Sequence, residues 1–321
     1  MSLPGLVDKR ASLLKMDSSL LLTQWHNFFA IYAFSLFFIT SNKLGLEKEK
    51  SVKTIEILEE AARRVHNNVK HLAGTKESGT DHGLGAGGDI SRRIDIVAEK
   101  TVLDYLREIN FECTVFGEEC GMVELSPNPR GFIIMDAIDG STNAVRGLPF
   151  FCCSLAFTPE DKLSSVTDGV IMDLHNGDLY SASKGKGAYM NGKKIQVHKE
   201  KPIYFVVGVD ISGISADTLP QLAPILSASN HVRHFGAVAL ELAIFARGLV
   251  DVFVDLRRKL RITDVAAGYL IALEAGGYVV DENGMPLDSN LSYDKRISFI
   301  AAANKETLAD VMKKLGLSPK I

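Results

Sequence analysis

Short apolar strands alternate with amphipathic helices in the second half of the chain, and this alternation limits the folds that the chain can adopt. The expected strands cover residues 203–209, 250–255, 277–280 and 297–302, and the expected helices cover 236–247, 264–275 and 305–315. Such alternation is typical of an α/β unit whose sheet is covered by helices. We therefore expect an α/β domain over residues 201–321.

The first half has a different pattern, in which helices come before a run of strands. Apolar residues spaced by threes and fours predict a helix over 52–72, and a second helix is expected over 91–109. Two short buried strands, 114–116 and 132–135, run into acidic residues, and 150–197 has the pattern of a β-meander with hairpin turns at Asn176-Gly177 and Asn191-Gly192. We expect an α+β domain over residues 47–200.

Residues 74–89 separate the first two helices and contain six glycines. Glycine-rich segments with Asp and Ser are typical of loops. Because Gly83-Leu84-Gly85 follows a helix and not a strand, a dinucleotide-binding turn is not expected. The segment is predicted to be a mobile flap at an active site.

Net charge and cysteine content limit the partners and the compartment that we expect. The net charge of −3 over 321 residues provides no field for a polyanion, so we expect no nucleic-acid partner. The four cysteines lack zinc-type spacing, and Cys152 and Cys153 adjoin in an apolar run, as expected of buried reduced thiols in a cytoplasmic protein.

The N-terminal extension, residues 1–46, is unusually apolar. Residues 18–42 contain no Asp, Glu, Lys or Arg, and the stretch is long enough to cross a bilayer as a helix. Thr23, Gln24 and His26 interrupt it. Three interpretations stay open: a segment packed against the protein body or a partner subunit, a membrane contact, or an incorrectly assigned start of the chain.

Chemistry is concentrated where the strand 132–135 ends. Asp136 and Asp139 follow it, separated by Ala137-Ile138, so two carboxylates and the carbonyl of Ile138 can converge on one point. Hard oxygen ligands of this kind suit Mg²⁺, which is an effective catalyst of phosphate ester hydrolysis. Gly140, Ser141 and Thr142 then open an expected helix whose free N–H groups can bind a phosphate.

Two further carboxylates complete the expected cluster. Glu118 follows the strand 114–116 in a Gly-Glu-Glu sequence, and Asp264 stands at the start of the helix 264–275. Alone, the first is typical of a solvated turn and the second of a helix cap. Together with Asp136 and Asp139, they predict a metal site.

These motifs, in this order and spacing, resemble the signatures of the inositol monophosphatase superfamily. The likeness covers Gly-Glu-Glu at 117–119, Asp-Ala-Ile-Asp-Gly-Ser-Thr-Asn at 136–143, the segment 185–192 and Asp-Val-Ala-Ala-Gly at 264–268. The resemblance implies a layered αβαβα sandwich of the sugar phosphatase type, usually a homodimer or larger homo-oligomer. The chain differs from the usual family pattern at Ala137, where proline is common, and at Thr263, where tryptophan is often found.

The resemblance also implies residue roles. Mg²⁺ would bind Glu118, Asp136, the Ile138 carbonyl, Asp139 and Asp264. Two or three ions are implied per subunit, and Mn²⁺ could replace Mg²⁺. Asp95 and Ser141, with Glu118, would be catalytic and would orient the water that attacks phosphorus. For Asp95 alone, a carboxylate that stabilises the first turn of its helix remains the alternative.

A basic cluster before Asp264 suggests the substrate. The arginines of this cluster resemble those of the archaeal-type branch of the family, which accepts both fructose 1,6-bisphosphate and inositol monophosphates. A second phosphate on the substrate needs cations of its own, and arginine can supply them. The candidate substrate-binding residues are Asp255, Arg257, Arg258, Lys259 and Arg261, in addition to Gly140, Ser141 and Thr142. A solvated basic turn is the alternative for the cluster.

Three functions remain open from the sequence. The first is hydrolysis of a small phosphorylated sugar or polyol, and the second is a nucleotide 3'-phosphatase of the same superfamily, for which no aromatic adenine clamp is evident. The third is a catalytically silent scaffold, which the retention of all five carboxylates, Asp95 included, disfavours.

Overall fold

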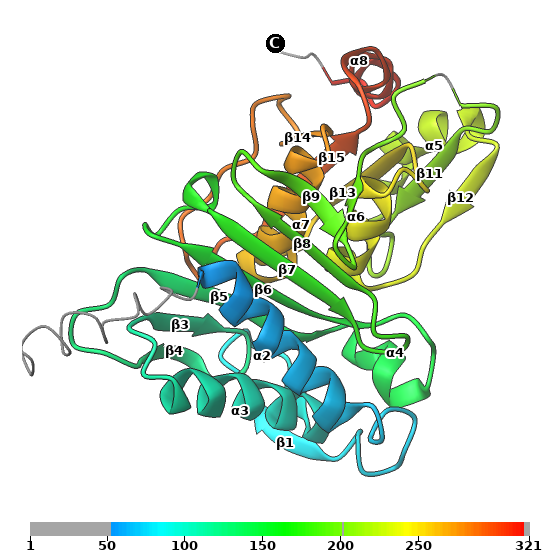
Figure 1. Cartoon of the computed structure of the whole chain (residues 1–321). Helices are drawn as coiled ribbons and strands as arrows, with labels where there is room; N and C mark the ends of the chain where they lie inside the picture. Colours follow the sequence, from blue (N-terminus) through cyan, green and yellow to red (C-terminus); the bar gives the residue numbers. More distant parts are fainter. Residues whose placement is uncertain (1–52, 201, 318–321) are drawn as a thin grey trace, which may run out of the picture. The chain divides into compact units, whose positions relative to one another are not determined.

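A computed structural model of the chain describes residues 53–200 and 202–317 (Figure 1). Its larger sheet has eight strands in the order β10-β9-β8-β7-β6-β5-β3-β4. All neighbours are antiparallel except β3 and β5, which are parallel. The strands are β3 (Thr114–Gly117), β4 (Gly121–Glu124), β5 (Phe132–Asp139), β6 (Cys152–Thr158), β7 (Asp168–Asp173), β8 (Leu179–Ser183), β9 (Gly187–Met190) and β10 (Lys193–Ile195).

A second sheet has five strands in the order β12-β11-β13-β15-β14. The first three are parallel to one another, whereas β15 is antiparallel to both of its neighbours. The strands are β11 (Val206–Val209), β12 (His231–Arg233), β13 (Val252–Leu260), β14 (Tyr278–Val280) and β15 (Ile297–Ala302).

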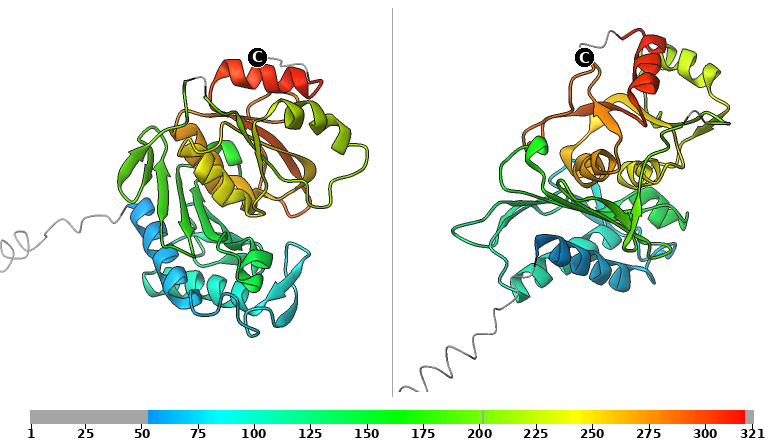
Figure 2. Two further views of the ribbon diagram at one scale, coloured as in Figure 1. Left: turned by 90° about the vertical axis from the view of Figure 1, so that its right-hand side faces the viewer. Right: turned by 45° about the horizontal axis from the view of Figure 1, so that its top comes forward.

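The helices form three layers around these two sheets (Figures 1 and 2). α2 and α3 cover one face of the large sheet, α6 and α7 lie between the two sheets, and α5 and α8 cover the outer face of the small sheet. The predicted αβαβα sandwich is therefore confirmed. The helices are α2 (Thr54–Val69), α3 (Arg93–Glu108), α4 (Ser141–Arg146), α5 (Leu219–Ala228), α6 (Val238–Ala246), α7 (Ile262–Glu274) and α8 (Lys305–Lys314), with a 3₁₀ turn at Leu163–Ser165.

Strand alternation explains why the large sheet is covered on both faces. In β5, Ile133 and Met135 pack with α2 and α3, whereas Ile134 packs on the opposite face with α6 and α7. Successive side chains of a strand point to opposite faces, so a strand buried on both sides reads as a continuous apolar run.

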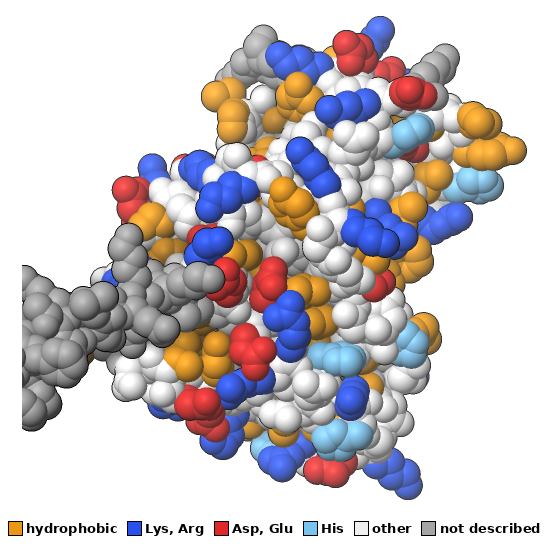
Figure 3. All heavy atoms as spheres, viewed as in Figure 1, with side chains coloured by type: hydrophobic (Ala, Val, Ile, Leu, Met, Phe, Trp, Pro, Cys, Tyr) orange, Lys and Arg blue, Asp and Glu red, His pale blue; other side chains and the backbone are white. Residues whose placement is uncertain are grey.

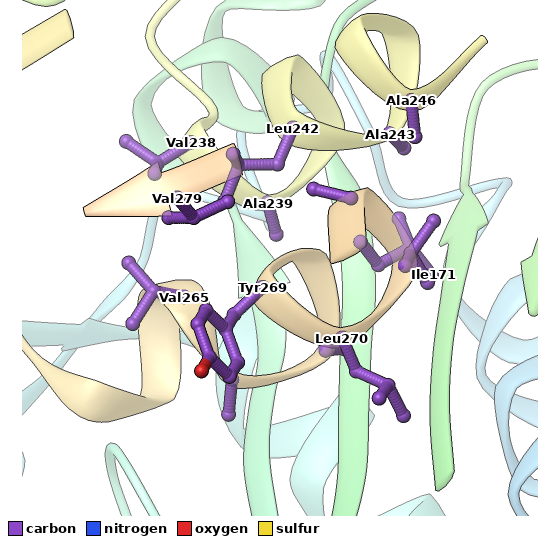
Figure 4. Close-up of a cluster of buried hydrophobic side chains, with 14 of the residues drawn as sticks. Ile171, Val238, Ala239, Leu242, Ala243, Ala246, Val265, Tyr269, Leu270 and Val279 are labelled. Atoms are coloured by element: carbon purple, nitrogen blue, oxygen red, sulfur yellow. The ribbon is translucent and has the colours of Figure 1, made fainter. Parts of the chain in front are cut away.

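The layer between the sheets is tightly packed (Figure 4). Ile171 from β7 and Val279 from β14 both meet the helix pair α6–α7, so this layer joins the two sheets into one core. A Cβ added to Gly268 of α7 would lie 2.7 Å from Leu242 of α6, a distance that real side chains avoid. The close approach of the two helices therefore requires glycine here.

The structure corrects three local predictions. Residues 74–89 are not only a loop: β1 (Asp81–Leu84) pairs with β2 (Ile90–Arg92), because main-chain hydrogen bonding does not depend on the exposed side chains. β13 extends past Asp255 through the basic cluster to Leu260. α5 was not predicted, since Pro220 and Pro224 obscured it; Pro220 lies in the first turn, where proline is tolerated, whereas Pro224 lies inside the helix.

The remaining expectations about the chain's organisation have different outcomes. The α/β and α+β halves correspond to the small and large sheets, but the domain boundary near residue 200 and the separate extension 1–46 stay predictions. Residues 18–42 lie outside the described residues. Among the described residues, no helix is long and apolar enough to cross a membrane.

On the face shown in Figure 3, cationic and anionic side chains are interspersed.

Candidate metal centre

The strand β5 carries the first two acidic residues, and a bulge aims them to the same side. Asp136 lies opposite Ser154 of β6, and Asp139 lies opposite Cys152, so three steps along β5 match two steps along β6. In a regular strand, residues three apart point to opposite faces, whereas the additional residue restores both to one face. The bulge therefore brings together the carboxylates of Asp136 and Asp139.

Glu118 reaches this point because β3 runs parallel to β5. Gly117 lies opposite Met135 in the register, and the amide of Glu118 donates to the Met135 carbonyl at 3.2 Å, so Glu118 stands beside Asp136. Carboxylate oxygens of Glu118, Asp136 and Asp264 lie within 4.8 Å of one another. Glu118 and Asp264 are 146 positions apart in the chain, and the fold brings all three residues to one point.

Asp264 and Asp139 are held by backbone N–H groups. Asp264 lies in the first turn of α7 and accepts a hydrogen bond from the amide of Arg261 at 2.8 Å. Asp139 accepts one from the amide of Ala239, at the start of α6, at 2.6 Å. The two helices between the sheets thus fix two of the predicted ligands.

Burial and mutual repulsion raise the pKa values of the cluster. Burial is the largest cause for each; for Asp136 the charge of Glu118 follows, and for Glu118 that of Asp264, so both pKa values lie well above the ordinary range. The pKa of Asp139 rises to about 7 from burial and from Asp264. Carboxylates in this arrangement are stable as anions only beside a cation, so the donor set fits a hard divalent metal.

A small cavity lies among Glu118, Asp136, Ile138 and Ser141. Its volume is about 10 Å³, close to what a single water-sized sphere needs. It is therefore large enough for an ion and too small for a sugar. A much larger groove of about 700 Å³ runs between α2 and α3 and contains none of the predicted ligands.

Asp95 and Ser141 form a hydrogen-bonded pair beside the cluster. The hydroxyl of Ser141 lies 2.9 Å both from Oδ1 of Asp95 and from the carbonyl of Ile138. Asp95 is in the first turn of α3, where its Oδ2 accepts the amide of Arg92 at 2.7 Å. Burial raises the pKa of Asp95 to about 6, and the Arg92 amide and Ser141 oppose that rise. The pair can position a water and accept its proton.

The helix α4 begins next to this pair. Gly140 is its N-cap with φ of 87°, a conformation that favours glycine, and Ser141 and Thr142 form the first turn. With six residues, α4 has a small dipole, so its free amides are the means by which it would hold a phosphate.

The basic cluster is dispersed by the fold. The side chain of Arg257 is 8% exposed, and it pairs with Asp210 at 2.8 Å and with the fully buried Asp255 at 2.6 Å. Arg261 donates to Glu118 at 2.6 Å and also pairs with Asp89. Arg257 and Asp255, both predicted to contact the substrate, thus pair with each other. Arg261 lies beside the carboxylate cluster.

Arg258 and Lys259 are the exposed members of the cluster. Arg258 has φ of 55° and pairs with Glu282 at 3.2 Å. Lys259 has no ion-pair partner within residues 53–200 and 202–317, and it lies over the turn at Gly213. Its charge is available to a ligand.

Sequence reasoning missed Glu99. Its two carboxylate oxygens accept the amides of Glu119 at 3.0 Å and Cys120 at 2.7 Å, so it supports the turn that carries Glu118. The sequence offered one signal for Glu99: it lies four residues after Asp95, and residues four apart share a helix face. Asp210 was also missed, because only the fold brings it to Arg257.

Comparison with known proteins identifies the family. Residues 50–317 match the model of the inositol monophosphatase family. The chain belongs to that family. The chain is therefore a metal-dependent phosphatase of phosphate monoesters, and the resemblance predicted from the motifs is confirmed.

Relatives within the family have different named activities. A fructose-1,6-bisphosphatase/inositol-1-monophosphatase of Methanothermobacter thermautotrophicus is 34% identical over 264 residues, covering 79% of this chain and 93% of the relative. A bifunctional NADP phosphatase/NAD kinase of Methanococcus maripaludis is 29% identical, and the match covers 77% of this chain but 47% of the relative. A crystal structure of an inositol monophosphatase–fructose 1,6-bisphosphatase superposes with a TM-score of 0.72 at 31% identity, covering 82% of this chain and all of that one.

Proposed function

We propose that the chain is a Mg²⁺-dependent phosphatase that hydrolyses fructose 1,6-bisphosphate and inositol monophosphates. The observation that carries the proposal is the convergence of Glu118, Asp136 and Asp264 within 4.8 Å, with Asp139 beside them. The 34% identity to a fructose-1,6-bisphosphatase/inositol-1-monophosphatase supports the substrate class.

The metal ligands would be Glu118, Asp136, the Ile138 carbonyl, Asp139 and Asp264. When bound, Mg²⁺ would neutralise phosphate charge and stabilise both the attacking and the leaving oxygens. The amides of Gly140, Ser141 and Thr142 would bind the phosphate oxygens. We also propose two or three Mg²⁺ per subunit, replaceable by Mn²⁺, and a cytoplasmic homodimer or larger homo-oligomer.

Asp95 and Ser141 supply the proton chemistry in this proposal. A carboxylate with a pKa of about 6 is ionised near neutral pH and can accept a proton from water, either directly or through the Ser141 hydroxyl 2.9 Å away. The bond between Ser141 and the Ile138 carbonyl ties this pair to the proposed metal ligands, so the pair would hold a water in a fixed position relative to a bound phosphate.

The distal phosphate of a bisphosphate would contact Lys259. Among the four predicted cations, Arg257, Arg258 and Arg261 already pair with carboxylates, whereas Lys259 does not among the described residues. A charge-assisted contact to phosphate contributes about 1.5–3 kcal/mol. Losing it should lower kcat/KM by about 10- to 150-fold.

Parallel kinetics on two substrates test this proposal. Lys259→Ala should reduce kcat/KM for fructose 1,6-bisphosphate and leave inositol 1-phosphate nearly unchanged. Arg258→Ala is the matched control, because Arg258 is an exposed neighbour already paired with Glu282. Equal losses on both substrates, or no loss in either variant, would refute the bisphosphatase assignment.

A nucleotide phosphatase is the second candidate, and an aromatic pair favours it. Phe150 and Phe235 stack at 4.5 Å, and Asn143 of α4 donates to the carbonyls of both at 2.7 Å. Phe235 is 37% exposed, so its ring can contact a base beside α4. Phosphate release from NADP and from adenosine 3',5'-bisphosphate, each compared with fructose 1,6-bisphosphate, distinguishes the two candidates.

A further inference from the structure

The turn from Gly117 to Cys120 carries the metal ligand Glu118, and it is held from two directions. From one direction, Glu99 of α3 accepts the amides of Glu119 and Cys120. From the other, the hydroxyl of Tyr293 donates to the carbonyl of Gly117 at 2.9 Å. The two contacts flank Glu118 in the chain.

Tyr293 is fixed in place by its own surroundings. Its ring stacks on Phe116, the fully buried residue before Gly117, with centroids 4.2 Å apart and planes 14° from parallel. Its carbonyl accepts a bond from Arg296 at 2.5 Å. The hydroxyl therefore approaches the turn from a rigid platform, in the segment between β14 and β15.

The turn has no room to adjust in another way. A Cβ on Gly117 would lie 2.5 Å from the sulfur of Cys120 and 2.8 Å from Oε1 of Glu99. A backbone packed this closely has a direction set by its hydrogen bonds, since small shifts produce clashes. The direction of the Glu118 carboxylate thus depends on the bonds that hold the turn.

We propose that Tyr293 is a positioning residue for Glu118, which places part of the metal site's support 175 residues away in the second half of the chain. The inference rests on the proposed role of Glu118 as a metal ligand. Groups that orient a ligand support the metal affinity or the activity of a site. Because Tyr293 contacts Gly117 and Phe116 and not the pair proposed to act on the water, we expect its loss to weaken metal binding more than turnover at saturating metal.

Tyr293→Phe tests the proposal, since it removes the hydroxyl and keeps the ring that stacks on Phe116. Mn²⁺ binding to the full chain, measured by titration calorimetry, should weaken by about 2- to 12-fold, as expected for one hydrogen bond. The KM for Mg²⁺ should rise in parallel, while kcat at saturating Mg²⁺ stays within about twofold.

Tyr189→Phe is the matched control. The Tyr189 hydroxyl also donates to a main-chain carbonyl, that of Lys186, at 3.1 Å. Tyr189 lies in β9, which β8, β7 and β6 separate from β5. This variant should bind Mn²⁺ as the wild type does.

A double-variant experiment tests whether Tyr293 acts through Glu118. In a Glu118→Gln background, Tyr293→Phe should change the Mn²⁺ affinity by less than about twofold, because the ligand that it positions is already altered. An undiminished effect in that background would overturn the inference.

Other outcomes are also decisive. A Tyr293→Phe chain that binds Mn²⁺ with wild-type affinity, whatever its melting temperature, would overturn the positioning role and leave the metal site intact. Absence of Mn²⁺ binding by the wild type would overturn the metal site itself, and the positioning role with it.

Discussion

Replacing Asp95 by Asn isolates the proton-accepting role that the site assigns to this carboxylate. In the structure, Oδ2 accepts the Arg92 amide at 2.7 Å and Oδ1 accepts the Ser141 hydroxyl at 2.9 Å. Asparagine keeps the shape and one acceptor oxygen, so it can still bond to the Arg92 amide. It cannot take up a proton near neutral pH.

The magnitude follows from these two contacts. A positioned proton acceptor contributes about 10²- to 10⁴-fold to the rate, which corresponds to about 2.7–5.5 kcal/mol in the activation free energy. Because the helix contact at Arg92 is retained, the free energy of unfolding should change little. Asp95→Ala would remove that contact too and cost roughly 0.5–2 kcal/mol of stability.

The assay is kcat at saturating Mg²⁺, together with Mn²⁺ affinity and melting temperature. Asp168→Asn is the matched control, since Asp168 also accepts a serine hydroxyl, that of Ser183 at 2.6 Å. Asp168 lies at the start of β7, at the opposite end of the sheet's strands from Asp136 and Asp139. The Asp168→Asn variant should keep the wild-type kcat.

Two results would refute the reasoning about Asp95. A kcat within about threefold of the wild type would remove Asp95 from the reaction, given the expected range. A collapse of Mn²⁺ affinity with normal kcat at saturating metal would make Asp95 a ligand.

Three further perturbations test other parts of the account. Asp139→Asn should keep the fold, because an amide oxygen can still accept the Ala239 amide, and should lose most turnover; near-normal turnover at saturating Mg²⁺ contradicts the site. Burial raises the pKa of Glu241 to about 8 from 4.5, so its stabilising contribution is complete below about pH 4.5 and is lost as the pH rises through about 8. In EDTA, Glu241→Gln should flatten the decline in melting temperature over this range, and an unchanged slope contradicts the shift. Deleting residues 1–46 should leave the catalytic constants intact and alter assembly or solubility, with salt-resistant partition of the full chain into membranes indicating a membrane contact instead.

The sequence predicted most strands and helices and pointed to the clustered carboxylates, because both depend on local signals. Strand alternation and helix spacing are read over a few residues, and Glu118, Asp136, Asp139 and Asp264 stand at the ends or beginnings of such elements. The bulge in β5, which aims Asp136 and Asp139 to one side, was not predicted.

Long-range pairing limited the rest. For the cluster from Arg257 to Arg261, the sequence does not reveal that Asp210 and Asp255 pair with Arg257. The role of the cluster in substrate binding stays a prediction. Tyr293 likewise carries no motif, and its contact with Gly117 exists only once β14 and β15 are in place. Local patterns cannot predict which charges a fold neutralises.

Phosphate release from fructose 1,6-bisphosphate, with Mg²⁺ and then with EDTA, tests the central claim most directly. Without a cation, Glu118, Asp136 and Asp264 repel one another and the phosphate. We therefore predict turnover in Mg²⁺, none in excess EDTA and full recovery when Mg²⁺ is restored. The same rate of phosphate release in EDTA would contradict metal-dependent catalysis at these carboxylates.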